Sequence, residues 1–186
     1  MTIKPLGKKV TAEELDKVLA GIKKGSRFIG PTAGVPNGVV LHNTYHPNLS
    51  RVEGYLRSRK YTPEQLIDNW WVNYIRMKWF SGPHIFVFPV GIYIACPLDH
   101  RGTHSPTFNR DKWGIEMIGD YETEQIPFTI KDLTAQAAAC FFRHLGVQPD
   151  ERNLKFHRED PRTDHKCPGK NVLDKGMWIN LIKEKL

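Results

Sequence analysis

The stretch Gly38-Val39-Val40-Leu41-His42 decides how this chain folds, because it is typical of a buried strand that ends on a polar side chain. A second stretch, Leu154-Lys155-Phe156-His157, has the same form near the other end of the chain. Runs with helical spacing and further strand-like runs alternate around these two. The interleaving favours the α/β class, with a single domain built on a mixed central β-sheet flanked by helices.

The two strand-end histidines, His42 and His157, are candidate metal ligands. Cys167 follows ten residues after His157, at the start of a turn that Pro168 and Gly169 fix. One thiolate and two neutral imidazoles suit Zn²⁺, and three protein ligands leave a fourth position for water. His165 is a competing third ligand, but we favour Cys167 because it begins the rigid turn. The pattern predicts a zinc hydrolase.

Length and composition indicate one soluble globular domain of 186 residues, of which 40% are hydrophobic and 25% charged. We divide it into an N-terminal helical extension at residues 1–37, packed on a catalytic domain at residues 38–186. No stretch approaches the roughly 20 apolar residues of a membrane span. The basic N-terminus lacks the apolar core of a secretory signal, so we expect cytoplasmic synthesis. We also expect a monomer, with Cys96 and Cys140 as buried free thiols.

The formal net charge of +7 favours an anionic partner, either nucleic acid or the phosphate- and carboxylate-bearing polymers of a bacterial envelope. We find no nucleic-acid-binding motif, and the basic residues are scattered, so we expect no nucleic-acid partner. The last helix places Trp178, Leu181 and Ile182 on one face. We interpret it as a packed helix, with contact to an anionic envelope surface as the alternative.

Helix caps and apolar spacing predict the elements around the candidate site. Thr11 and Glu14 form a capping box for a first helix that Gly25 ends. Thr129 and Asp132 are expected to cap a third helix, with Phe128 packing on its first turn. The other predicted elements are a polar, basic loop at 43–61, helices at 62–75 and 174–185, and strands at 84–89, 92–96 and 113–118.

Several stretches together resemble the N-acetylmuramoyl-L-alanine amidase family, which includes phage lysozyme-type amidases, cytosolic anhydro-muropeptide amidases and peptidoglycan recognition proteins. The resemblance covers about three-quarters of the chain, from Val39 to Val172. The matching stretches are Val40-Leu41-His42-Asn43-Thr44, Gly82-Pro83-His84-Ile85, Thr103-His104-Ser105, Trp113-Gly114-Ile115-Glu116-Met117-Ile118-Gly119 and His157 through Gly169.

The resemblance implies a zinc ion bound by His42, His157 and Cys167. It also implies cleavage of the amide between the lactyl group of N-acetylmuramic acid and L-alanine. Peptidoglycan or its muropeptide fragments would then be the partner. Asn43 and Thr44, directly after a ligand, are expected to cap the strand or to contact substrate.

Glu116 is the candidate general base, because a carboxylate in an otherwise apolar strand must be paired, near a metal or facing a cleft. The alternative is an exposed residue on the outer face of the strand. In the family's cytosolic branch a glutamate occupies the matching position. In the lysozyme-type branch a tyrosine before the second histidine contributes instead, and here Pro83 stands in that place. We therefore assign the base to Glu116.

Three more histidines receive roles from the resemblance. Family members place a lysine, threonine or arginine two residues before the last ligand, where this chain has His165, and we assign it as the donor that stabilises the oxyanion. His84 and His104 match histidines that line the family's cleft. We expect them to contact substrate or to support the metal ligands.

Three functions remain open, two of them enzymes with the same chemistry and one a binding module. We favour a phage or prophage endolysin that acts on the bacterial cell wall, because a compact basic catalytic domain without a signal suits that task. A cytosolic enzyme that recycles anhydro-muropeptides is the alternative within the same chemistry. A non-catalytic peptidoglycan-binding module is less favoured, because binding-only relatives typically lack the ligand cysteine that Cys167 supplies.

Overall fold

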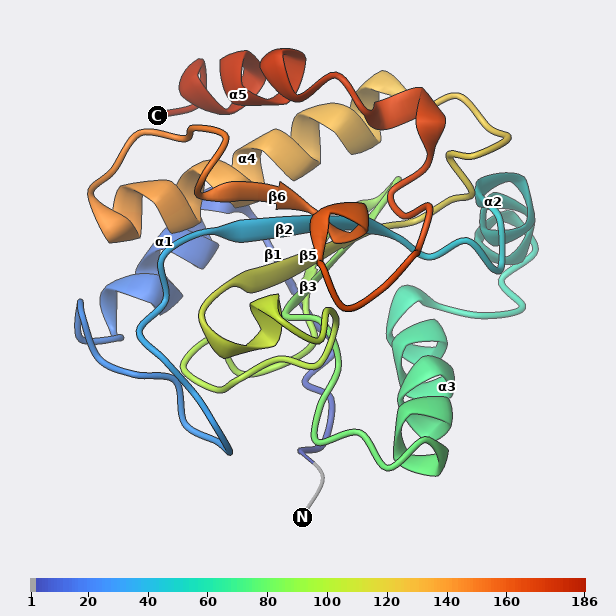
Figure 1. Ribbon diagram of the computed structural model, residues 1–186. Helices are drawn as coiled ribbons and strands as arrows, with labels where there is room; N and C mark the ends of the chain where they lie inside the picture. Colours follow the sequence, from blue (N-terminus) through green and yellow to red (C-terminus); the bar gives the residue numbers. More distant parts are fainter. Residues whose placement is uncertain (1–2) are drawn as a thin grey trace.

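A computed structural model describes residues 3–186, and it contains one six-stranded sheet with helices around it (Figure 1). The strand order is β1-β4-β3-β5-β2-β6. The strands are β1 (Lys8–Val10), β2 (Val39–Asn43), β3 (Ile85–Phe88), β4 (Gly91–Ile94), β5 (Trp113–Met117) and β6 (Leu154–Phe156). β3, β5, β2 and β6 run parallel to one another, whereas β4 is antiparallel to β3 and to β1. The predicted mixed α/β sheet is confirmed.

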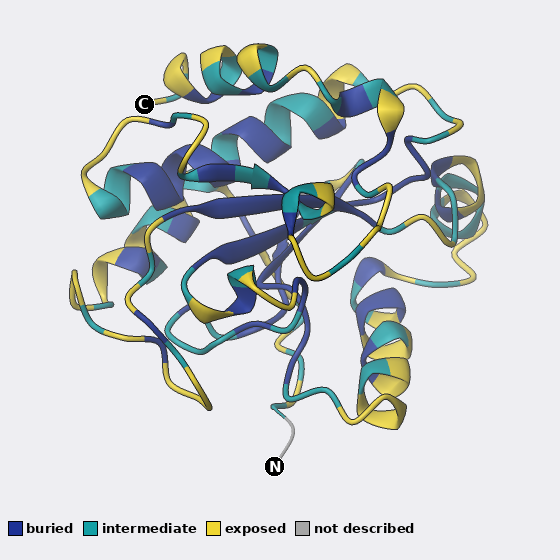
Figure 2. Ribbon diagram, in the orientation of Figure 1, coloured by how far each residue is buried: buried dark blue, intermediate teal, exposed yellow. Residues whose placement is uncertain are grey.

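Five α-helices surround this sheet. They are α1 (Ala12–Ala20), α2 (Leu49–Arg57), α3 (Pro63–Arg76), α4 (Phe128–Leu145) and α5 (Lys175–Lys183). α4 lies along one face of the sheet and contacts β3, β4 and β5, while α1 and α5 pack on α4. Burial follows this layering, because the sheet and the inner side of α4 are dark blue in Figure 2. α2 and α3 follow β2 in the chain and lie beyond its carboxyl end (Figure 1).

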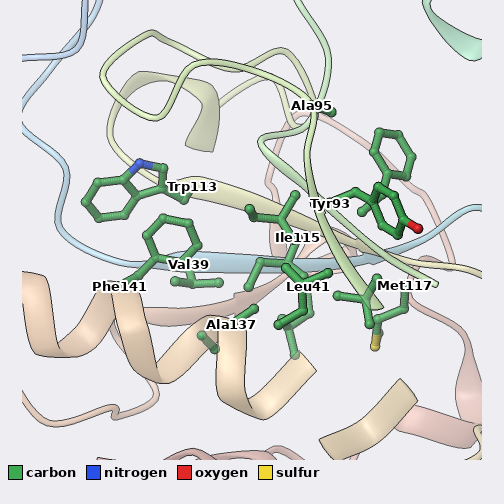
Figure 3. Close-up of a cluster of buried hydrophobic side chains, with 14 of the residues drawn as sticks. Val39, Leu41, Tyr93, Ala95, Trp113, Ile115, Met117, Ala137 and Phe141 are labelled. Atoms are coloured by element: carbon green, nitrogen blue, oxygen red, sulfur yellow. The ribbon is translucent and has the colours of Figure 1, made fainter. Parts of the chain in front are cut away.

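Side chains along the central strands alternate between the face that packs on α4 and the face that carries the candidate site. Leu41 of β2 and Ile115 of β5 are fully buried and pair across the sheet, and they point toward Ala137 and Phe141 of α4 (Figure 3). Successive side chains of a strand point to opposite faces. His42 and Glu116, the next residues along each strand, therefore face away from α4.

The largest difference from the predicted elements lies within residues 43–61, where the structure has a helix, α2, in place of a loop. Asn48 caps this helix by accepting the Arg51 N–H, and Leu49 and Val52 bury its inner side. The carboxylate of Glu124, 75 positions away, accepts the backbone N–H of Leu49. The stabilising partner is therefore distant in sequence. The basic residues of this segment also make its apolar helical spacing hard to recognise.

Two helix boundaries also differ from prediction. α1 keeps its predicted capping box but ends at Ala20, with Gly21 and not Gly25 following it. α4 begins at Phe128 after Pro127, and no side chain caps it. The predicted packing of Phe128 is wrong, because its side chain is 77% exposed.

The N-terminal segment enters the common sheet, which the sequence did not predict. Lys8–Val10 forms the edge strand β1, and its short polar pattern gives little strand signal. The division between residues 37 and 38 stays a prediction. Cys96 and Cys140 are buried and free, as expected. Among the described residues, no helix is long and apolar enough to cross a membrane.

Candidate metal centre

The ends of three neighbouring parallel strands bring the site together. β2 pairs with β5 and with β6, and Leu41 lies opposite Phe156. One residue further along, His42 and His157 therefore stand side by side, and their ring centroids are 4.6 Å apart. Ligand sites in parallel sheets form at the carboxyl ends of the strands. The sheet itself thus places two of the three predicted ligands.

Cys167 reaches the same point from the loop after β6. One ligand atom from each of His42, His157 and Cys167 lies within 4.8 Å of the others, and Cys167 Sγ is 3.7 Å from His42 Nδ1. The backbone N–H of Asn43 donates a hydrogen bond of 3.3 Å to this sulfur. Gly169 holds the turn tightly, because a Cβ there would lie 2.3 Å from the Tyr121 carbonyl carbon. The predicted set of three converges.

A hydrogen-bonded chain fixes which nitrogen of His42 faces the cysteine. The Lys112 carbonyl can only accept, so His104 Nε2 donates to it across 3.2 Å. Burial lowers the pKa of both His42 and His104, which keeps their rings neutral. His104 Nδ1 therefore accepts from His42 Nε2 at 3.0 Å. The remaining nitrogen, His42 Nδ1, points a lone pair toward Cys167.

The backbone of β5 makes room for this chain. A Cβ at Gly114 would lie 2.5 Å from the His104 ring, a distance that non-bonded atoms do not tolerate. His104 is 6% exposed, and its own N–H is held by the Asn109 side chain at 2.6 Å. His104 thus supports a predicted metal ligand directly and also lines the cavity described below.

The residues present fit a zinc ion. His157 Nε2 is buried and hydrogen-bonds no described residue, which is costly for a polar atom unless a further group binds nearby. Burial raises the pKa of the Cys167 thiol well above its usual value, so a thiolate there is favoured only with a cation close by. Two imidazoles and one sulfur are a donor set that zinc prefers. His165 is stacked on His157 with centroids 4.7 Å apart but is not among the converging atoms.

Glu116 lies beside the three candidate ligands because β5 and β2 are in register there. Its partner across the ladder is His42. Burial raises the pKa of the Glu116 carboxyl to about 8. A cation close by would lower that value again, toward the range in which a carboxylate exchanges protons near neutral pH. The predicted base therefore faces the site and not the core.

A cavity of about 750 Å³ opens over this group, within the usual size of a ligand site. Its lining includes the predicted residues His42, Asn43, Thr44, His104, Glu116, His157, His165 and Cys167. Asn43 and Thr44 are also tied to the end of β5, since the Asn43 amide donates to the Gly119 carbonyl and Thr44 Oγ1 accepts the Gly119 N–H. They both cap the strand and border the cavity.

His84 is expected to contact substrate or to support the metal ligands. It is fully buried and does not line the cavity. Its Nε2 donates to the His100 carbonyl at 2.9 Å, and its Nδ1 accepts the Gly114 N–H at 3.0 Å. Both ring nitrogens therefore bond to backbone, and the ring packs against His104 with centroids 5.8 Å apart. Support of the metal ligands by His84 stays a prediction.

The sequence also missed several lining residues. Tyr74 and Trp79 line the cavity with stacked rings 4.9 Å apart. Lys166 and Tyr45 also border the cavity. Tyr45 has a positive φ of 58°, a backbone conformation that sequence patterns do not reveal.

Residues 32–170 match the sequence profile of the family described as N-acetylmuramoyl-L-alanine amidase. The chain belongs to this family. No curated protein sequence matches the chain. The family is thus shown by the profile, over the same segment that holds the converging histidines and cysteine.

Solved structures of family amidases and recognition proteins share the fold. The amidase LysC from Clostridium intestinale has 19% identity and a TM-score of 0.55, covering 83% of this amidase-family chain and 91% of its own. The endolysine LysCS from the same organism has 18% identity and a TM-score of 0.50, with 78% and 84% covered. Drosophila PGRP-LB has 23% identity and a TM-score of 0.59, with 83% and 85% covered. A variant of PGRP-LB is known in complex with tracheal cytotoxin.

Proposed function

We propose that this protein is a zinc-dependent N-acetylmuramoyl-L-alanine amidase that hydrolyses the lactyl–L-alanine amide of peptidoglycan. The observation that carries the proposal is the convergence of His42, His157 and Cys167 beside Glu116, at the base of one cavity. When bound there, zinc would supply Lewis acidity, which polarises a carbonyl and lowers the pKa of water. The remaining chemistry belongs to side chains of this chain.

Glu116 would accept the proton of the attacking water and later deliver it to the nitrogen of L-alanine. The C–N bond of the amide then breaks, and the lactyl carboxylate and the free amine of the peptide leave. The position of Glu116 supports this role, because it faces the cavity from the strand next to His42. General acid–base help of this kind typically contributes about 10²–10⁴-fold in rate.

His165 would donate a hydrogen bond to the oxyanion that forms on the scissile carbonyl. Its ring borders the cavity and stacks on His157, so it is near the reacting group. A neutral imidazole and an imidazolium both carry an N–H, so His165 can donate in either protonation state. A donor of this kind is typically worth about 2.7–4 kcal/mol.

Within the family, an endolysin is the role we favour. The endolysine LysCS shares the fold, and the positive charge of this chain suits the anionic polymers of a cell wall. A recycling amidase would use the same centre on soluble anhydro-muropeptides. A binding module would use the cavity without chemistry, but it would not need the sulfur and the carboxylate to converge.

One assay set separates these possibilities. The zinc-loaded protein is incubated with intact sacculi and with soluble anhydro-muropeptides, and free L-alanine-terminated peptides are quantified. Release from sacculi supports the endolysin, whereas release from the soluble fragments alone assigns the recycling role. Binding of muropeptide with no peptide release, by protein that carries stoichiometric zinc, would instead leave only the binding module.

A further inference from the structure

The two sides of the candidate metal centre come from segments that are not neighbours in the sheet. His157 follows β6, an outer strand that pairs with β2. His104, which accepts the hydrogen bond that orients His42, lies in the segment between β4 and β5. The strand ladders therefore do not by themselves fix the position of the His104 segment relative to the His157 segment.

One buried carboxylate, that of Asp160, joins these two segments. Asp160 is 1% exposed, and its Oδ2 accepts the Ser105 hydroxyl at 2.5 Å and the Thr107 N–H at 2.7 Å. Among the described residues, these are the only two hydrogen bonds between segment 103–112 and segment 154–169. Ser105 directly follows His104 in the chain. The carboxylate therefore acts one residue away from the ring that orients His42.

Asp160 also shapes the loop that leads from His157 to His165. Its backbone N–H donates to the His157 carbonyl at 2.9 Å, and its Oδ1 accepts the Arg162 N–H at 2.9 Å. Its carbonyl accepts the Thr163 N–H at 3.2 Å, and Thr163 Oγ1 accepts the His165 N–H at 3.1 Å. The backbone and the side chain of Asp160 together hold this turn in one conformation.

Hydrogen bonds, and not a cation, compensate the burial of this carboxylate. Among the described residues, no lysine, arginine or histidine forms an ion pair with Asp160. Burial raises the pKa of Asp160, but the donors of Ser105, Thr107 and Arg162 lower it by more, to about 2. The group is therefore ionised, and hydrogen bonds to an ionised acceptor are shorter and stronger than those between neutral groups.

We propose that Asp160 is a positioning residue of the metal centre, which holds His157 in place relative to the pair His42 and His104 and so raises the affinity for zinc. The inference rests on the zinc binding of the proposed function. It gives a role to a residue that does not line the cavity over the metal centre. Ligands that are held in place before the ion binds lose less conformational entropy on binding, so the affinity is higher.

The test compares the same substitution at the two ends of β6. Asp150 anchors the turn before the strand, where its Oδ1 accepts the N–H groups of Arg152 and Asn153 at 2.8 and 3.0 Å. Competition with a chelator gives the Kd for zinc, and thermal unfolding of the metal-free protein reports stability. We expect Asp160→Asn to weaken zinc binding by about tenfold or more, as for other residues that orient metal ligands. Asp150→Asn should lower stability and leave the affinity for zinc unchanged.

Two further measurements separate positioning from stability. The visible absorption of the Co²⁺-loaded protein reports the arrangement of ligands around the ion, and it should change in Asp160→Asn but not in Asp150→Asn. Ser105→Ala removes one donor, so it should weaken zinc binding less, and it tests the inference even where Asp160→Asn fails to fold. Added to Asp160→Asn, it should have little further effect, because both changes break the same hydrogen bond.

The outcomes distinguish this inference from the proposed function. Unchanged zinc affinity in every Asp160 and Ser105 variant that folds, or an equal loss in Asp160→Asn and Asp150→Asn, overturns the positioning role. A wild-type protein that binds no zinc overturns it as well. Weaker zinc binding in Asp160→Asn, with no cleavage of any muropeptide by the zinc-loaded wild type, would refute the amidase and leave the positioning role standing. Cleavage by the wild type with unchanged affinity in the variants would do the reverse.

Discussion

The two faces of the central sheet differ in chemistry although the same strands build both. On one face Leu41 and Ile115 pack under α4, and on the other His42 and Glu116 border the cavity. Adjacent residues thus serve stability and chemistry in alternation. The site therefore takes its geometry from the packing of the opposite face. Substitutions on the face under α4 should lower mainly the free energy of unfolding, whereas substitutions on the cavity face should lower zinc binding or kcat.

The largest effect is expected from Cys167→Ser, which should remove zinc and reduce activity to the uncatalysed rate. A serine hydroxyl is a much poorer zinc ligand than a thiolate. Metal analysis after dialysis and a peptide-release assay measure both quantities, with thermal unfolding as the control for folding. Full zinc content in this variant would mean that the cysteine is not a ligand.

Next in size is Glu116→Gln, which should lower kcat by about 10²–10⁴-fold while zinc content is unchanged. The amide keeps the size of the side chain but cannot accept the water proton. Metal analysis and kcat are measured on the same preparation. If zinc were lost together with activity, Glu116 would have to be reassigned as a ligand.

A smaller loss is expected from His104→Ala, which removes the acceptor that fixes the tautomer of His42. Partners that orient metal ligands typically contribute about 10–100-fold in metal affinity. Competition with a zinc chelator gives the affinity, and ¹⁵N NMR of the metal-free protein reports the tautomer of His42. An unchanged affinity with an unchanged tautomer would show that His104 does not orient the ligand.

The smallest effect should come from the other face. Ile115→Val, one residue before the base, should cost about 0.5–1.5 kcal/mol in the free energy of unfolding and leave kcat nearly unchanged. Denaturant unfolding measures the loss of stability, and the peptide-release assay measures kcat. A large loss of kcat here, at small loss of stability, would contradict the separation of the faces.

Much of this arrangement could be predicted from sequence, because the strands that hold the site carry strong local signals. The apolar runs before His42 and His157 predicted two strands of the sheet, and the carboxylate of Glu116 in an otherwise apolar strand predicted that it faces a cleft or a metal. The helix α2 could not be found in the same way, since Glu124 stabilises its first turn from a distant segment. Helical spacing alone likewise does not show that Tyr74 lines the cavity, because it does not distinguish a ring at a cavity from one in the core.

His84 illustrates a limit of a different kind. Its match to a family histidine predicted substrate contact or support of the metal ligands, and its hydrogen-bond partners are the backbone of residues 100 and 114. Only tertiary structure reveals such partners. Similarly, nothing local to Arg101 predicts that its buried Nε has no hydrogen-bond partner among the described residues.

The two histidines of the metal centre are held by strands of unequal stability, since His157 follows the short strand β6. It has three residues and is an outermost strand of the sheet, whereas β2, which carries His42, lies between two neighbours. Short outer strands open more readily than inner ones. An ion held by His42 and His157 would therefore stabilise the outer strand β6 against the inner strand β2. When zinc binds, amide hydrogen exchange should slow far more in β6 than in β2. The metal would then stabilise the fold at β6 as well as take part in hydrolysis.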